Sequence, residues 1–379
     1  MYEYQRNNRF FAQIQNDMSE LGVEDLSAQG AEDISPAYGG IYFSANKAAL
    51  YRINYTSRYI TRILAPLVSF KCHSTRYLYN KAKEINWTDI FTVDNSFAIF
   101  STVSNSRIKH SLYATLRLKD AMVDWFNEHF KKRPNIERID PDVWINLHIE
   151  NNRAVISLDT SLGSLHRRGY RARTVKAPMQ ETLAAAIISL AAWDGSKPIY
   201  DPMCGSGTLL SEALMFYCRI PSGFLRQRFG FEFLPDFEYD LWNSIKRDAD
   251  QKIRGLPKGL ISGSDISSEV VEAARTNIKK LPDGEKIGLR VMDYKKIQQL
   301  ENTIIVCNPP SGIRLERDKD LSELYGELGD FLKQRCKGST AYIYFGDRGL
   351  IPEIGLKPSW KKPLKNGGLD GRLAKFEIY

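Results

Sequence analysis

The sequence has few cysteines, and none of them is placed to form a metal site or a redox pair. The five are scattered along 379 residues: Cys72, Cys204, Cys218, Cys307 and Cys336. An odd number without a CxxC pair or metal-ligand spacing argues against a disulfide framework and against a zinc site. We therefore expect reduced thiols, a cytoplasmic protein and no bound metal.

Long apolar runs are also missing. The longest weakly polar stretch, Leu183–Trp193, is too short to cross a bilayer, and no cationic leader with an apolar segment opens the sequence. We find no internal repeat and no low-complexity segment. With 43% hydrophobic and 26% charged residues, the composition predicts a globular chain of two or more domains without a membrane partner.

Acidic residues are scarce in the middle of the chain. Residues 51–200 carry 22 Lys and Arg against 13 Asp and Glu, whereas residues 1–50 carry 3 against 7. A basic block with interleaved aromatic residues suits a nucleic-acid backbone, because neutralised phosphates release counterions. A solvated basic surface would give the same excess, and charge alone leaves both interpretations open.

Residues 9–159 alternate between strand-like runs and helical patterns. Helices are predicted over Asn46–Thr61 and Ser111–His129. The predicted strands are RFFAQI, GGIYFSA, SFAIFSTV, DVWINLHI and RAVISLDT. The mixture predicts an α+β region of two small units joined near residue 45, with domain ranges 1–45 and 46–160.

From about residue 161 to 379 the rhythm changes to strand, turn and helix, repeated. An arginine-rich connector, residues 163–178, leads into a helix predicted over Glu181–Trp193. Strands alternating with helices predict a mostly parallel, doubly wound sheet. The segment NGGLDGRL near the end predicts an antiparallel hairpin. In the long insertion 218–259, we expect the aromatic residues to form a local core and Arg226 and Arg228 to be available to RNA.

Acidic residues follow three predicted strands of this region. Asp201 precedes Gly205 and Gly207 in DPMCGSG, Asp265 follows in GSDIS, and Asp293 in VMDY. An acid ahead of the glycines, without GxGxxG spacing, suits a ligand with a cationic amino-acid end rather than a pyrophosphate. This pattern points to S-adenosylmethionine, with Asp265 on the ribose and Asp293 on the adenine. Taken singly, each acid is more often a turn or N-cap residue.

The motif NPP ends another apolar run, Ile304–Cys307. Asn308, Pro309 and Pro310 form a stiff, non-helical stretch, which is either a rigid loop or a device that aims polar groups at a substrate. If the Asn308 side-chain oxygen and the Pro309 carbonyl accept the N–H bonds of an exocyclic amine, its nitrogen is directed at a methyl donor. The fixed carbonyl then needs little reorganisation.

With these motifs, the sequence resembles the THUMP-domain class I RNA methyltransferases, closest to the bacterial enzymes that methylate N2 of a guanine in 23S ribosomal RNA. The resemblance covers nearly the whole chain. The matching segments include FFAQI, INWTDIF, RPNIERIDPDVWINLHI, SLHRRGYR, APMQETLAAAI, DPMCGSGTLL, NPPSGIRL and NGGLDGRL. It implies a ferredoxin-like piece and a THUMP domain that bind RNA, followed by a Rossmann-like, S-adenosylmethionine-dependent methyltransferase domain.

The resemblance also implies roles for individual residues. Asn308, Pro309 and Pro310 would carry catalysis. The implied cofactor residues are Asp201, Met203, Gly205, Gly207, Thr208, Asp265, Ile266, Asp293 and Asn308, with Arg168, Tyr170, Glu181 and Thr182 covering the pocket. The connector arginines could instead meet RNA phosphates.

One position departs from the family pattern. The residue after the two prolines is usually aromatic and stacks on the flipped base, but here it is Ser311. Without the aromatic residue, the stacking on the base has to come from another ring, such as Tyr170, or be replaced by RNA contacts elsewhere. Three alternatives to the rRNA reaction stay open: the same reaction on tRNA, a catalytically silent RNA-binding module, and a DNA adenine methylase, which the basic front half disfavours.

Overall fold

The chain forms two compact units in the computed structural model, which describes residues 1–173, 179–310, 318–367 and 369–379. The first unit comprises Met1–Leu165 and Arg226–Arg247, and the second comprises His166–Leu225 and Asp248–Tyr379. The chain therefore passes between the units three times.

The first unit is built on one eight-stranded sheet in the order β2-β3-β1-β4-β8-β7-β5-β6. Its strands are β1 (Arg9–Gln13), β2 (Glu32–Ala37), β3 (Gly40–Ser44), β4 (Arg62–Lys71), β5 (Ser96–Ser104), β6 (Asn135–Ile136), β7 (Val143–Glu150) and β8 (Arg153–Asp159). Its helices are α1 (Glu3–Asn7), α2 (Ser19–Ala28), α3 (Lys47–Thr56), α4 (Thr75–Lys83) and α5 (Ser111–Phe130). The five strands and two helices predicted for this region are present.

Strand β4 was not among the predicted strands, although it joins the two halves of this sheet. It pairs with β1 through Arg62–Leu64 and with β8 over most of its remaining length. A proline inside the run argues against a central strand, since it cannot donate to the ladder. The structure accommodates Pro66 at an irregularity, because the pairing register with β8 shifts between Pro66 and Val68.

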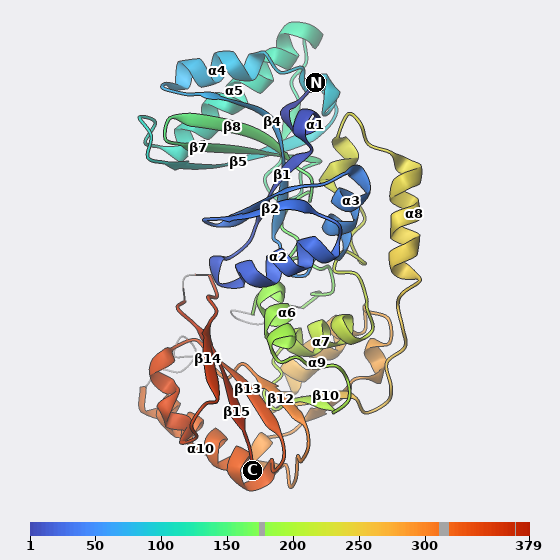
Figure 1. Ribbon diagram of the computed structural model, residues 1–379, viewed down its shortest axis with the longest axis vertical. Helices are drawn as coiled ribbons and strands as arrows, with labels where there is room; N and C mark the ends of the chain where they lie inside the picture. The colour runs from blue at the N-terminus through green and yellow to red at the C-terminus, as the bar shows by residue number, and fades with distance from the viewer. Residues whose placement is uncertain (174–178, 311–317, 368) are drawn as a thin grey trace. The chain divides into compact units, whose positions relative to one another are not determined.

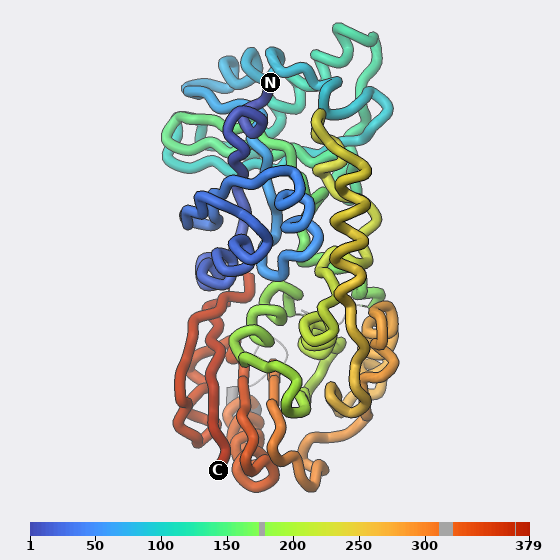
Figure 2. Tube along the Cα trace, turned by 45° about the vertical axis from the view of Figure 1, so that its right-hand side comes forward, coloured from blue at the N-terminus to red at the C-terminus, as the bar shows by residue number. Residues whose placement is uncertain are grey.

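The aromatic residues of the insertion form a local cluster, as expected, and this cluster also packs on α3. Phe229 stacks on Phe231 with ring centroids 5.1 Å apart, and Trp242 contacts both rings. Phe231 stacks on Tyr51 with ring centroids 4.6 Å apart, and Trp242 contacts Tyr55 at 5.3 Å. Residues 226–247 accordingly belong to the first unit (Figure 2). Burying these large rings against α3 makes the insertion part of the hydrophobic core of that unit.

Arg226 is half-buried and makes contacts inside the protein, contrary to its expected availability to RNA, whereas Arg228 stays exposed, so its expected contact with RNA stays a prediction. Arg226 donates to the carbonyl oxygens of Ser161 and Leu162, at 2.6 and 3.0 Å. Arg228 forms an ion pair with Asp142 at 2.8 Å.

The second unit is built on a seven-stranded sheet in the order β11-β10-β9-β12-β13-β15-β14. Its strands are β9 (Ile199–Asp201), β10 (Ile261–Asp265), β11 (Gly288–Val291), β12 (Ile304–Cys307), β13 (Thr340–Phe345), β14 (Trp360–Pro363) and β15 (Arg372–Glu377). The first five strands of this order (β11, β10, β9, β12 and β13) run parallel to one another. Strand β15 pairs antiparallel with both β13 and β14. The predicted doubly wound sheet with its antiparallel hairpin is confirmed.

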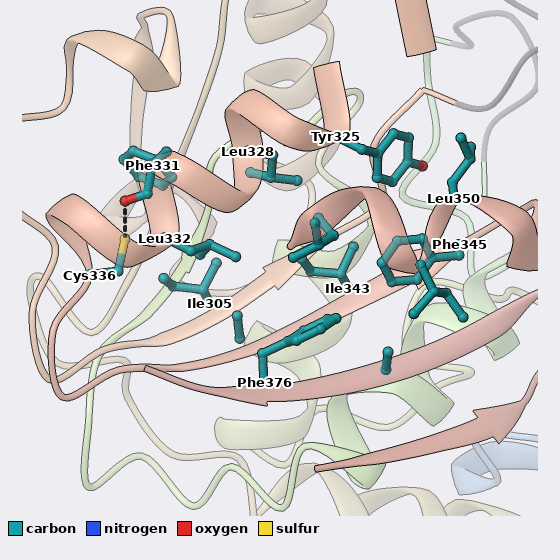
Figure 3. Packing of buried hydrophobic residues seen from close by; sticks show 14 of the residues in the cluster. Ile305, Tyr325, Leu328, Phe331, Leu332, Cys336, Ile343, Phe345, Leu350 and Phe376 are labelled. Atoms are coloured by element: carbon teal, nitrogen blue, oxygen red, sulfur yellow. Dashed lines mark hydrogen bonds between the residues drawn. The ribbon is translucent and has the colours of Figure 1, made fainter. Parts of the chain in front are cut away.

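Helices cover both faces of this second sheet: α6 (Glu181–Leu190), α7 (Thr208–Tyr217) and α9 (Ser268–Ile278) on one side, and α10 (Asp318–Arg335) on the other (Figure 1). Helix α8 (Tyr239–Asp250) lies within the insertion. Figure 3 shows α10 packed on β12, β13 and β15, where Leu328, Leu332, Ile305, Ile343 and Phe376 are at most 1% exposed. Among the described residues, no helix is long and apolar enough to cross a membrane.

Candidate active site

A cavity of about 300 Å³ lies in the second unit at the carboxyl ends of the parallel strands, within the size range of small-molecule sites. Seventeen of the described residues line it: Met179, Asp201, Pro202, Met203, Cys204, Gly205, Ser206, Thr208, Leu209, Asp265, Ile266, Asp293, Tyr294, Lys295, Asn308, Pro310 and Leu324. The structure thus gathers nine residues predicted for the site around one space: Asp201, Met203, Gly205, Thr208, Asp265, Ile266, Asp293, Asn308 and Pro310.

The order of the strands explains why four of these polar residues meet. The sheet order β11-β10-β9-β12 sets the ends of four parallel strands side by side. Asp293, Asp265, Asp201 and Asn308 follow or end these strands in the same order. Neighbouring strands are about 4.8 Å apart, so the four side chains span one edge of the sheet. This edge is where open α/β sheets bind ligands.

Each of the three acids is also a turn residue. One carboxylate oxygen (Oδ1) accepts a hydrogen bond from the backbone N–H two residues on, at 3.0 Å for Asp201, 3.1 Å for Asp265 and 3.0 Å for Asp293. The turn and ligand interpretations are therefore compatible, because the turn itself uses only one oxygen of each acid, although the second oxygen of Asp265 also accepts a backbone N–H, from Gly205.

The carboxyl group of Asp201 is held in an environment that disfavours its charge. The residue is 1% exposed, and its burial, with the negative charge of Asp265 as a smaller cause, raises the pKa of Asp201 well above its ordinary value. A cationic ligand group beside Asp201 would compensate for this buried charge. The geometry therefore favours a ligand with a positively charged end at this position.

We predict that Asp201→Asn raises the melting temperature of the ligand-free protein by a few degrees at neutral pH. Because the folded-state pKa lies above the unfolded-state value of about 3.9, ionised Asp201 lowers the free energy of unfolding. The difference between variant and wild type should be largest above the folded-state pKa and vanish as the pH falls towards 3.9. Thermal melting across this pH range checks it; an Asp201→Asn protein less stable at neutral pH would contradict it.

The glycine turn between β9 and α7 needs its two glycines for different reasons. Gly205 and Gly207 have φ angles of +54° and +80°. A Cβ at Gly207 would lie 2.8 Å from Ile278 Cδ1 of α9, so this glycine permits close packing of the turn on the helix. A Cβ at Gly205 would meet nothing within 4 Å, and Gly205 lines the cavity. A side chain there would occupy space that a ligand can use.

The turn is also tied to the second acid. The Gly205 N–H donates to Asp265 Oδ2 at 3.0 Å, which links the loop after β9 to the end of β10. Asp265 therefore both lines the cavity and fixes the shape of the glycine turn.

The NPP motif places an amide on the cavity wall. Asn308 is half-buried, and within the described ranges neither its side chain nor the Pro309 carbonyl has a hydrogen-bond partner. Pro309 is buried and does not line the cavity. The Pro310 carbonyl accepts a hydrogen bond from the hydroxyl of Tyr325 at 3.5 Å, and Tyr325 stacks on Phe345 in the core below (Figure 3). Ser311 lies outside the described residues.

Arg168 and Tyr170 do not line the cavity. Both are 1% exposed, and both contact Glu212 of α7, at 3.5 Å from Arg168 Nε and 3.1 Å from the Tyr170 hydroxyl. A fully buried Tyr170 is not available to stack on a base in place of the missing aromatic residue, which corrects that suggestion. The predicted contact of these two residues with a cofactor stays a prediction.

Glu181 and Thr182 begin α6 and are likewise absent from the cavity wall. Glu181 pairs with Arg171 at 3.0 Å. The Thr182 hydroxyl is buried and has no hydrogen-bond partner in the part of the chain that the structure describes. Gly207, the N-cap of α7, does not line the cavity either.

Arg171, which is not among the residues predicted for the site, joins the connector to the glycine turn. Its guanidinium donates to the Met179 carbonyl at 3.0 Å, to Thr208 Oγ1 at 3.2 Å and to Ser206 Oγ at 3.4 Å, in addition to its pair with Glu181. Three of these four partners line the cavity. The connector contains several arginines, and nothing in the neighbouring sequence distinguishes Arg171 from the others as the one that binds the glycine turn.

Asn277 of α9 is a second positioning residue that only the structure reveals. It is 1% exposed, and its amide oxygen accepts the backbone N–H groups of Ala172 and Arg173 at 2.8 and 2.9 Å. Its amide nitrogen donates to the carbonyls of Arg173 and Ser206 at 3.1 and 3.2 Å. The connector is thus fastened to the glycine turn from the helix side as well.

The remaining walls suit a ligand that is part cationic, part hydroxylated and part flat and apolar. Leu209, Ile266 and Leu324 supply apolar surface beside the three carboxylates. The hydroxyl of Tyr294, another lining residue, is buried and has no hydrogen-bond partner among the described residues. With the open space at Gly205, these groups fit S-adenosylmethionine, which combines an aminocarboxylate, a sulfonium, a ribose and an adenine.

Three family models match consecutive parts of the chain. The RlmL ferredoxin-like domain matches residues 9–64, the THUMP domain residues 72–159, and the RMKL-like methyltransferase domain residues 168–375. The methyltransferase match alone covers more than half of the chain. The domain ranges predicted from the sequence stay predictions.

Whole-chain relatives carry the same combination. The protein slr0064 of Synechocystis sp., provisionally named an RNA methyltransferase, is 36% identical over 98% of this chain and 97% of its own length. The ribosomal RNA large subunit methyltransferase K/L of Vibrio cholerae is 35% identical over 98% of this chain, which spans only 53% of that relative.

A solved structure shows the same fold. The protein SMU.472, provisionally named a methyltransferase and crystallised with SAH, superposes with a TM-score of 0.85 at 26% identity over 98% of both chains. The chain therefore belongs to the THUMP-domain class I RNA methyltransferases, a family that uses S-adenosylmethionine as its methyl donor.

Proposed function

We propose that this protein transfers a methyl group from S-adenosylmethionine to the exocyclic N2 of a guanine in large-subunit ribosomal RNA. The observation that carries the proposal is the single cavity in which Asp201, Asp265, Asp293 and Asn308 meet at adjacent strand ends. The names of the K/L relatives support ribosomal RNA as the substrate class. The chain spans about half the length of those relatives.

The order of the acids along the sheet edge supports the binding mode. Asp293, Asp265 and Asp201 would receive the adenine amino group, the ribose hydroxyls and the amino-acid end of the donor, in that spatial order. Asn308, on the strand beyond Asp201, would then stand on the acceptor side. When bound, S-adenosylmethionine supplies an electrophilic methyl group on its sulfonium sulfur.

The NPP motif would orient the acceptor amine. The lone pair of a guanine N2 is delocalised into the ring, so the nitrogen needs precise placement to react. Asn308 Oδ1 stands at the cavity without a described internal partner and can take one N–H of that amine. The Pro309 carbonyl would take the other N–H, although Pro309 is buried and does not line the cavity as the structure describes it. The Tyr325 contact to Pro310 and the two fixed φ angles hold these acceptors in place before the substrate arrives.

A transfer assay tests the proposal. The protein is incubated with tritiated S-adenosylmethionine and, in parallel, with undermethylated 23S rRNA, transfer RNA and duplex DNA, and the labelled nucleoside is identified after nuclease digestion. We expect label in N2-methylguanosine from rRNA. Label in tRNA guanine would move the substrate to tRNA, and label in DNA adenine would overturn the proposal. Binding of S-adenosylmethionine and RNA without transfer would favour a silent RNA-binding module.

A further inference from the structure

A second cavity of the second unit adjoins the first one and has no part in the binding mode described so far. Its volume is about 360 Å³. Seven of the described residues line it: His166, Arg167, Gly169, Arg171, Met179, Gln180 and Glu181. We call it the connector pocket, because four of these residues belong to the connector. Met179 lines both cavities, so the connector pocket shares a wall with the cavity of the three acids.

Positive charge is in excess at the connector pocket. Arg167 is exposed, and the half-buried Arg171 forms its ion pair with Glu181 at 3.0 Å. Glu181 supplies the one carboxylate among the described lining residues, and this pair compensates for its charge. Lys280 of α9 adds an ammonium group at the pocket, since it donates to the Gly169 carbonyl at 3.4 Å. Two guanidinium groups and an ammonium group against one carboxylate suit an anionic ligand.

His166 lies in the same positive environment. Burial is the largest cause that lowers the pKa of His166 below its ordinary value, although the Glu181 carboxylate opposes it. Three guanidinium groups lower this pKa as well, those of Arg167, Arg168 and Arg171. A bound anion would favour the charged form of the imidazole, which would then be a further donor to that anion.

The start of α6 contributes neutral donors. Gln180 and Glu181, its N-cap and first residue, line the pocket, and the Gln180 side chain accepts none of the N–H groups of the first turn. The Thr182 hydroxyl of the same turn is 0% exposed and has no hydrogen-bond partner among the described residues. The first N–H groups of a helix lack partners within the helix and carry partial positive charge, so they favour an anion.

The connector pocket is held in a fixed position beside the first cavity. Arg171 donates to Ser206 and Thr208, two residues that line the first cavity. Asn277 accepts the N–H groups of Ala172 and Arg173, which follow Arg171 in the connector. A ligand that fills the first cavity can therefore extend to a pocket that is already formed, at little cost in ordering.

We propose that the connector pocket binds a backbone phosphate of the RNA strand that carries the target guanine, with Arg167 as its main contact. A nucleotide whose base enters the first cavity brings the phosphates on either side of its ribose to the rim of that cavity. A guanidinium group can donate two parallel hydrogen bonds to a phosphate. The proposal rests on the proposed function in taking guanine in RNA as the substrate. The donor carboxylate is the competing anion, and the affinity for S-adenosylmethionine separates the two.

Three small probes that differ only in the phosphate test this subsite. Guanosine, guanosine 3′-monophosphate and guanosine 5′-monophosphate are titrated by NMR into the 379-residue protein saturated with S-adenosylhomocysteine. We expect one monophosphate to bind about 10-fold more tightly than guanosine. Arg167→Ala should remove this gain without changing the affinity for guanosine or S-adenosylmethionine, and Arg167→Lys should keep part of it. Arg173→Ala is the matched control, because Arg173 is exposed in the same connector but does not line the pocket.

Binding of undermethylated 23S rRNA at several salt concentrations gives an independent measurement. Arg167→Ala should weaken RNA binding about 10-fold at low salt. It should also lower the slope of log affinity against log salt concentration by about 1, as expected for the loss of one phosphate contact. Arg173→Ala should change the slope less.

Each outcome decides for or against the subsite. No gain in affinity from either phosphate, or an equal loss of that gain in Arg167→Ala and Arg173→Ala, would overturn it. A loss of affinity for S-adenosylmethionine in Arg167→Ala as large as the loss for the monophosphate would assign the pocket to the donor carboxylate instead. If the gain depends on Arg167 but wild type methylates no RNA guanine, the proposed reaction fails and the subsite stands. If Arg167→Ala binds 23S rRNA and forms N2-methylguanosine as wild type does, the subsite fails and the proposed reaction stands.

Discussion

Asn308→Ala should lower the turnover number about 100- to 1,000-fold while leaving the affinity for S-adenosylmethionine within a few-fold of wild type. Asn308 lines the cavity beyond Asp201 in the order of strands, and no described residue binds its side chain. In the proposed reaction its oxygen accepts an N–H of the acceptor amine. Its removal therefore costs orientation and transition-state stabilisation rather than donor binding. Single-turnover methyl transfer and calorimetric titration measure the two quantities.

Asn308→Asp is the matched variant, since it keeps a side-chain oxygen at the same position. It should retain more activity than Asn308→Ala if acceptance of the N–H is the role of this residue. Equal losses of turnover and of donor affinity in Asn308→Ala would remove the assigned role and would make Asn308 part of the donor site instead.

Arg171→Ala should lower kcat/KM about 100-fold and weaken binding of S-adenosylmethionine, although Arg171 is not itself among the residues that line the cavity. Arg171 holds Met179, Ser206 and Thr208 from one guanidinium, and all three line the cavity. Without it, the connector and the glycine turn lose one of the anchors that join them, while the hydrogen bonds of Asn277 remain. The variant also leaves Glu181, at 5% exposure, as a buried carboxylate without this partner, so its melting temperature should fall as well.

Two further variants separate positioning from stability. Arg171→Lys keeps a positive charge beside Glu181 but cannot reproduce a planar fork of donors, so its melting temperature should approach wild type while donor affinity stays low. Arg173→Ala is the control, because Arg173 is exposed two residues away and its described contacts are through its backbone. A loss of donor affinity in Arg173→Ala equal to that in Arg171→Ala would assign the effect to the connector as a whole.

The stability prediction for Asp201 and the activity predictions have a common physical origin. A carboxyl group buried at the end of β9 and close to Asp265 costs the ligand-free protein stability, as its raised pKa indicates. A cationic group that binds beside Asp201 removes this cost. The unfavourable environment of Asp201 in the ligand-free protein therefore strengthens the binding of such a group. Asp201→Asn should therefore combine higher stability with weaker donor binding.

The strand-end polar residues could be predicted from the sequence because their signals are local. Short apolar runs mark the strands, and the alternation of strand and helix predicts parallel pairing. Parallel strands end at one edge of a sheet, so the three acids and Asn308 are expected to meet there. The glycine turn is equally visible, since Gly205 and Gly207 stand at a position where a left-handed backbone begins a helix.

The sequence by itself determined the two kinds of sheet, the class of the second domain and the main cavity residues, because these follow from periodicity and from residues close together in the chain. Only the tertiary structure decided that residues 226–247 pack on α3, that Arg171 and Asn277 fasten the connector to the glycine turn, and that Tyr170 is buried. Each of these depends on which surfaces meet after the chain has folded, and contacts between distant residues leave no periodic trace in the sequence.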